Sequence, residues 1–187
     1  MRFSGSEPAS ALGWNHVASL LALEALRSAS PQTASRVDIR PFERRNLARI
    51  VEIERASFGK DAWPGEMFLQ TWRDSPELFL VARQGRRIAG YSIARMDFRG
   101  AELESIAVHP RYRGRGVAQA LLDATLSGVQ RQGGGALRLM VSTTNAPALR
   151  FYRQYGFVRK RLVKSYYGAG RDAWRMRLER SSLRPKQ

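Results

Sequence analysis

The sequence predicts an α/β fold, of the α+β kind, built around a central sheet with helices beside it. Three strands follow one another at 78–83, 87–96 and 101–108, and short glycine-containing turns join them into an antiparallel group. The segment that follows, 117–129, has apolar residues at helical spacing. The chain has 187 residues, which is enough for one domain with a proper core and not for two.

The first 35 residues differ from the rest in composition. Residues 1–8 are polar, residues 9–29 carry leucine and valine at helical spacing, and SASPQTAS at 28–35 has the composition of a linker. No basic segment precedes a continuous apolar core, so we expect no secretory signal, and Glu7 and Glu24 disfavour a transit peptide. We therefore expect an extension with one extra N-terminal helix at 1–35, a domain at 36–180 and a basic tail at 181–187.

Within the domain, proline and glycine mark where elements end. We predict a strand at 37–42, a helix at 46–58 that ends before Ala62-Trp63-Pro64, and a helix at 65–73. After the three antiparallel strands come the helix from 117, a strand at 136–142, a helix opened by Asn145 and a last hairpin. The predicted order is β-α-α-β-β-β-α-β-α-β-β.

The most informative stretch is LESIAVHPRYRGRGVAQALL, residues 103–122. A strand ends at Val108, His109-Pro110 breaks it, and a basic glycine loop runs into the helix. Free backbone N–H groups and the helix dipole at such a loop suit a phosphate or pyrophosphate. The spacing fits neither a Walker loop nor a Rossmann loop. A helix-capping loop with solvated arginines is the alternative interpretation of this stretch.

A second motif lies downstream, from Asn145 to Phe157. Asn145 suits a helix N-cap, Pro147 the first turn and Gly156 the residue after the helix end. By itself this pattern also describes a capped helix that packs Phe151 and Tyr155 in the core.

Together the two motifs resemble the GNAT N-acetyltransferase superfamily. Arg113, Gly116 and Ala118 match its Arg/Gln-x-x-Gly-x-Gly/Ala loop, and 145–157 matches N-x-x-A-x-x-F/Y-Y-x-x-x-G-F. The resemblance covers about 37–179 and implies the GNAT fold, a mixed and mostly antiparallel sheet flanked by helices. It implies acetyl-CoA as co-substrate, no metal, and these coenzyme-binding residues: Ile106, Ala107, Val108, Arg113, Gly114, Arg115, Gly116, Val117, Ala118, Gln119, Asn145 and Tyr152.

The hairpin after Lys164 bears on the acceptor. By pattern it is a strand ending in two aromatics, a glycine turn and a return strand. Its Tyr166-Tyr167 pair is also similar to the RimI-type N-terminal acetyltransferases, which act on a ribosomal protein, and so is Trp63-Pro64. This resemblance implies that Trp63, Tyr166 and Tyr167 bind a protein N-terminal α-amine.

The chemistry requires a base for the ammonium, N–H donors for the oxyanion and an acid for the leaving thiolate. The ends of strand 106–108 can supply the donors, and the resemblance makes Tyr152 the acid. RimI-type enzymes carry a glutamate where this chain has Met140, and methionine cannot accept a proton. We therefore predict Glu104 as the base, directly or through water, with a surface charge as the alternative interpretation and Glu54 as a weaker candidate.

Charge and cysteine content complete the expectations. The net charge is +16, and all of the excess lies after residue 35. A ribosome or another anionic partner, or simply a solvated basic surface, explains this equally well. The absence of cysteine excludes disulfides and is compatible with the cytoplasm. There is no apolar run of transmembrane length, so we expect no membrane partner.

Two other functions stay open at this point. One is acetylation of a small amine or of protein lysine, although a cationic antibiotic would need an acidic pocket. The other is a non-catalytic module that binds acyl-CoA, which the missing glutamate at Met140 makes conceivable.

Overall fold

We analysed a computed structural model of the chain, which describes residues 37–179. The predicted extension at 1–35, with its helix, and the predicted tail at 181–187 lie outside the described residues. Both stay predictions.

The order of strands and α-helices is the predicted one, and the ends agree closely with expectation. Four single turns of 3-10 helix are additional, at Arg44–Asn46, Gly59–Asp61, Pro76–Leu78 and Pro110–Tyr112. The elements are β1 Val37–Pro41, α1 Leu47–Phe58, α2 Gly65–Asp74, β2 Phe79–Gln84, β3 Arg87–Asp97, β4 Gly100–Val108, α3 Val117–Arg131, β5 Ala136–Ser142, α4 Ala146–Gln154, β6 Val158–Val163 and β7 Ala173–Glu179.

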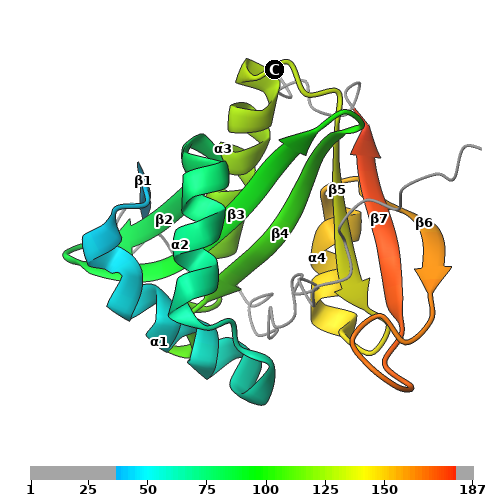
Figure 1. The fold of residues 1–187 in the computed structure, drawn as a ribbon, viewed down its shortest axis with the longest axis horizontal. Helices are drawn as coiled ribbons and strands as arrows, with labels where there is room; N and C mark the ends of the chain where they lie inside the picture. The colour runs from blue at the N-terminus through cyan, green and yellow to red at the C-terminus, as the bar shows by residue number, and fades with distance from the viewer. Residues whose placement is uncertain (1–36, 180–187) are drawn as a thin grey trace, which may run out of the picture.

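The strands form one mixed sheet in the order β1-β2-β3-β4-β5-β7-β6. Only the β4–β5 pair is parallel, and it is short: 101–103 pair with 137–139. Beyond Leu103 the two strands diverge, so the sheet opens in its middle (Figure 1). The β5-facing edge of β4 from Glu104 to Val108 is therefore left without a strand partner.

Two clusters of buried side chains hold the helices to opposite faces of the sheet. On one face α3 packs on β2, β3 and β4, and one buried cluster joins residues of α3, α4, β4, β5 and β7, among them Leu121, Tyr152 and Met176. On the other face α1 and α2 pack an aromatic cluster, including Phe68 and Tyr91, onto β2 and β3 (Figure 1). The apolar face predicted for the helix from 117 is confirmed, since Val117, Leu121, Leu122 and Val129 are buried.

The final hairpin differs from the strand pattern read from its sequence. β6 ends at Val163, and Tyr166 and Tyr167 lie in the connecting loop rather than at the end of the strand. Ser165 has φ +52°, a left-handed conformation that interrupts the extended chain. Asp172 closes the loop, because its carboxylate accepts from the Ser165 amide at 2.9 Å and from Lys164 Nζ at 2.7 Å.

None of the helices described between 37 and 179 is long and apolar enough to cross a membrane.

Candidate active site

The loop between β4 and α3 carries a row of free amides. Gly114 and Gly116 have φ +71° and +75°, and Gly116 stands at the N-terminal cap of α3 with no side chain capping it. The first backbone hydrogen bond of the helix runs from Ala120 N to Gly116 O at 3.0 Å. Among the described residues, no backbone acceptor is found for the amides from Gly114 to Gln119. The Gly116 Cα also faces open space, so an anion can approach the backbone closely.

The arginines of this loop have distinct environments. Arg113 turns back onto the strand, and its Nε donates to Val108 O at 3.1 Å. Its Nη2 is buried without a partner among the described residues, and burial lowers the pKa of the guanidinium. Arg115 lies over the Tyr112 ring at 5.7 Å and is exposed. Arg113 therefore joins the loop to the end of β4, and Arg115 is the arginine that stays accessible.

Tyr152 lies on α4, in the buried cluster that also contains residues of β4 and β5. The whole residue is buried, and its hydroxyl has no hydrogen-bond partner among the described residues. Burial raises the pKa of this hydroxyl well above its ordinary value, so it stays protonated at neutral pH. Asn145 begins the same helix, and its side-chain Oδ1 accepts from Ala148 N at 3.1 Å. The predicted N-cap is thus confirmed.

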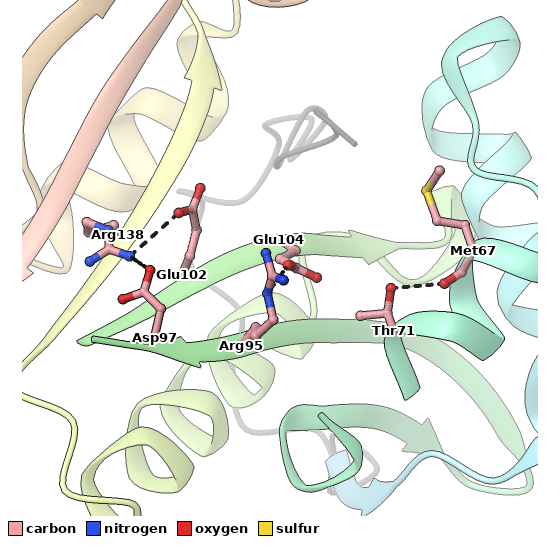
Figure 2. Close-up of polar contacts among 7 residues, drawn as sticks. All are labelled: Met67, Thr71, Arg95, Asp97, Glu102, Glu104 and Arg138. Atoms are coloured by element: carbon pink, nitrogen blue, oxygen red, sulfur yellow. Dashed lines mark hydrogen bonds and ion pairs between the residues drawn. The ribbon is translucent and has the colours of Figure 1, made fainter. Parts of the chain in front are cut away.

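Glu104 owes its position to a β-bulge. Ile93 pairs with Ser105 and Ala94 pairs with Leu103, so Glu104 is the extra residue of β4. Its carboxylate accepts from Arg95 Nε at 2.8 Å, and its side chain is 18% exposed (Figure 2). Burial raises the pKa of Glu104 despite the opposing effect of Arg95. A carboxyl group in this state is a better proton acceptor near neutral pH than a solvated one.

Arg138, Asp97 and Glu102 form a second set of charged contacts. Arg138 of β5 is paired with Asp97, and its Nη2 lies 3.6 Å from Glu102 Oε2 (Figure 2). These contacts tie the end of the β3–β4 hairpin to β5, where the two halves of the sheet still touch.

The hairpin tyrosines face these carboxylates. Burial raises the pKa of Tyr166 well above its usual range, and the negative charges of Glu102 and Glu104 raise it further. The Tyr167 hydroxyl donates to Met140 O at 3.3 Å. Met140 is itself buried in the core on β5 and offers no titratable group. Tyr166 therefore lies within the electrostatic reach of Glu104, and Tyr167 contacts the backbone of Met140, the residue that replaces a glutamate; the substrate-binding roles of both tyrosines stay predictions.

An ion pair links the two loops that border this region. Arg171 Nη1 in the β6–β7 loop lies 2.8 Å from Asp61 Oδ2, in the turn after α1. These residues are 110 positions apart in the chain. The ion pair therefore brings the turn after α1 and the β6–β7 loop next to each other.

Trp63 is placed differently from its expected role. Its ring is 5% exposed and packs on Phe68 with the centroids 5.4 Å apart. A ring buried in this way offers little surface to a bound peptide, and the substrate-binding role of Trp63 stays a prediction. Its backbone amide donates to Glu54 Oε1 at 3.0 Å, a contact that sequence reasoning did not anticipate.

Comparison with known proteins agrees with this geometry. The acetyltransferase (GNAT) family matches residues 47–157, more than half of the chain. The chain belongs to the GNAT acetyltransferase family.

This GNAT protein is 34% identical over 147 residues to the N-alpha-acetyltransferase RimI of Mycobacterium tuberculosis, covering 75% of this chain and 91% of the relative. Among solved structures it resembles Ard1 from Thermoplasma volcanium, with a TM-score of 0.73 and 30% identity over 76% of this chain and 97% of the other. It also resembles the ribosomal-protein-S18-alanine N-acetyltransferase from Escherichia coli, with a TM-score of 0.69 and 26% identity over 77% and 94%. The predicted GNAT fold and the RimI-type resemblance are confirmed, and the chain is an acetyl-CoA-dependent N-acetyltransferase.

The residues present fit the coenzyme. The free amides at 114–119 suit a pyrophosphate, the unpaired edge of β4 at 106–108 suits a chain that bonds like a strand, and the partnerless Tyr152 hydroxyl suits a sulfur at the opening. The coenzyme roles of individual residues stay predictions. The bulge at Glu104, its partner Arg95 and the Glu54 contacts were not predicted, because each depends on pairing between distant segments.

Proposed function

We propose that this enzyme transfers the acetyl group of acetyl-CoA to the α-amine of a protein N-terminus, by direct attack of the amine on the thioester. The observation that carries the proposal is the Asp61–Arg171 ion pair, which holds the turn after α1 beside the loop that carries Tyr166 and Tyr167. We take the region that these two loops border as the acceptor cleft, with Glu104, whose charge reaches Tyr166, at its floor. Phenolic side chains beside a partly buried carboxylate suit an extended peptide that presents its amine at the opening of the sheet.

Tyr152 and Glu104 have complementary roles in this proposal. The coenzyme supplies an acetyl group activated as a thioester. Tyr152, protonated at neutral pH, gives its proton to the departing thiolate. Glu104, directly or through a water, takes the proton of the amine.

The weak base favours one class of amine. An α-amine titrates at about 7.7–8.0 and a lysine side chain at about 10.4, so a larger share of α-amine is already neutral near pH 7. A single carboxylate that is also paired with Arg95 suffices for the former and serves the latter poorly. The N-alpha-acetyltransferases among the relatives support the same choice.

The experiment compares three acceptors at equal concentration. One peptide has a free α-amine and an internal lysine, a second has the same sequence with a blocked N-terminus, and the third acceptor is a polyamine. We expect mass spectrometry to place the acetyl group on the α-amine alone. Preferred transfer to the blocked peptide or to the polyamine would overturn the proposal in favour of lysine or small-amine acetylation.

We also propose a ribosomal protein as the acceptor and the cytoplasm as the location. One named structural relative acts on ribosomal protein S18, which supports the first part. The charge of the chain also supports the ribosomal acceptor, because residues 150–177 hold nine basic side chains and one acid, a net charge of +8. A surface with this excess favours an anionic assembly such as a ribosome.

A further inference from the structure

Glu54 of α1 is a buried carboxyl group outside the set of reacting residues. It is fully buried in the aromatic cluster under α1 and α2. Its Oε1 accepts from Trp63 N at 3.0 Å, and its Oε2 accepts from the Tyr91 hydroxyl. The same hydroxyl lies 2.9 Å from Ser105 Oγ, which is also fully buried. Burying an ionisable group costs free energy, which hydrogen bonds to that group must offset.

The partners of Glu54 belong to one wall of the acceptor cleft and to the strand at its floor. Trp63 follows the Gly59–Asp61 turn, whose Asp61 pairs with Arg171 across the cleft. Ser105 is the residue directly after the bulged Glu104, in the part of β4 beyond Leu103 that has left its parallel partner. One carboxyl group on one helix thus fixes a wall of the cleft and the strand that carries the base.

We infer that Glu54 is a positioning residue, which holds the loop at Trp63 and the β4 bulge at Ser105 in the geometry that the acceptor amine requires. The inference rests on the proposed function for the identity of the acceptor. Glu54 has no exposed surface, and its two oxygens are occupied by Trp63 and Tyr91, so it acts through these residues rather than on the amine itself.

The two arms of this network are separable. Glu54→Ala removes both arms, whereas Tyr91→Phe removes the arm to Ser105 and leaves the bond to the Trp63 amide. Glu54→Gln keeps an acceptor for the Trp63 amide and a polar contact to Tyr91, so geometry is kept without an ionisable group. Ser57→Ala is the matched control, because Ser57 lies on the same helix and its hydroxyl is equally buried but has no partner among the described residues.

The test measures three quantities for each variant: amide hydrogen exchange at Trp63, kcat and KM for the accepted amine, and the dissociation constant of coenzyme A. Glu54→Ala is expected to speed exchange at Trp63 and raise the acceptor KM about fivefold to thirtyfold, with coenzyme affinity unchanged. Tyr91→Phe is expected to keep Trp63 protected and lower kcat about twofold to tenfold. Glu54→Gln and Ser57→Ala are expected to behave like the parent.

Two results would overturn the inference. The first is parental exchange at Trp63 in Glu54→Ala. The second is a Glu54→Gln variant as impaired as Glu54→Ala, which would make the proton of Glu54 essential instead of its position. If Glu54→Ala does not fold, Glu54→Gln and Tyr91→Phe still decide the matter. Exchange at Trp63 does not depend on which amine is accepted, so failure of the proposed acceptor leaves this readout intact.

Discussion

The hydroxyl of Tyr152 is a polar group held in the core without a partner among the described residues. Such a group costs about 1–3 kcal/mol relative to a satisfied one. Tyr152→Phe is therefore expected to leave the free energy of unfolding unchanged or higher. General acid help is worth about 10²–10⁴ in rate, and the variant should lose it. Urea unfolding and single-turnover rates measure the two effects.

Tyr155→Phe is the control for Tyr152. Tyr155 lies one residue beyond the same helix, and its hydroxyl donates to Gln119 O at 3.2 Å. Its removal should lower stability by about 1 kcal/mol and leave the chemical step unchanged. A Tyr152→Phe enzyme with the parental single-turnover rate would show that Tyr152 is only a core residue.

Glu104 determines the pH dependence. Its folded-state pKa is raised, so the carboxylate becomes available to accept a proton at a higher pH than usual. Glu104→Gln should lower the rate at neutral pH and approach the parental rate at high pH, where the free amine needs no base. Glu102→Gln, its neighbour beside Arg138, should keep the base, with the profile moved toward lower pH because the Glu102 charge helps to raise the pKa of Glu104. Met140→Glu is expected to raise activity. A parental pH–rate profile for Glu104→Gln would exclude it as the base.

Glu54 makes folding stability depend on pH. Burial is the main cause that raises its pKa from 4.5 to about 7, against the opposing bonds from Trp63 and Tyr91. The folded state therefore keeps this proton while the unfolded state loses it, and stability falls as pH rises from about 4.5 to about 7. The difference amounts to about 3 kcal/mol at most. Chemical unfolding at pH 4.5, 6 and 7.5 should show a steeper slope in the parent than in Glu54→Gln, which keeps only the smaller contribution of Glu104; equal slopes would contradict the assignment.

At the scale of elements, the loop before α3 can be tested with one substitution and a symmetric control. Gly116→Val places a branched side chain where the pyrophosphate is expected to meet the backbone, and calorimetry should show at least a tenfold loss of coenzyme affinity. Gly133→Val is the control, since Gly133 just beyond the other end of α3 also has φ +75° and open space around its Cα. Both variants share the strain of about 1–2 kcal/mol. Unchanged affinity in a folded Gly116→Val protein would refute the predicted site.

Elements that depend on residues within their own segment could be predicted from the sequence, and features that depend on contacts between distant segments could not. The end of β4, the start of α3 and the cap at Asn145 were predictable, because proline, glycine and asparagine act on their own backbone. The loop position of Tyr166 was not, because it depends on the left-handed Ser165 and on Asp172, seven residues away. The register that makes Glu104 a bulge and the ion pair between Asp61 and Arg171 depend on separate strands and loops, so no local pattern encodes them.

At the scale of the whole molecule, the basic surface around β6 tests the proposed anionic partner. Arg153, Lys160 and Arg161 are exposed on α4 and β6, and changing all three to Gln removes three charges without altering any predicted site residue. The triple variant should keep parental activity on a short peptide. Its binding to ribosomes, measured by cosedimentation, should weaken and depend less steeply on salt than that of the parent. If the triple variant and the parent bound ribosomes equally at all salt concentrations, the basic surface would be a solvated surface and not a binding site.

The short pairing between β4 and β5 affects how cooperatively the molecule unfolds. Only three residue pairs join β1–β4 to β5–β7 within the sheet, so two lobes share one narrow seam. An open backbone edge inside a sheet is also a template for unwanted pairing with other chains. A ligand that bonds along that edge would act as an eighth strand across the seam. At a hundredfold excess over its dissociation constant it would add about 2.7 kcal/mol to the free energy of unfolding. The coenzyme would then couple the lobes into one cooperative unit and shield the edge, so the supply of acetyl-CoA would govern the lifetime of the enzyme as well as its turnover.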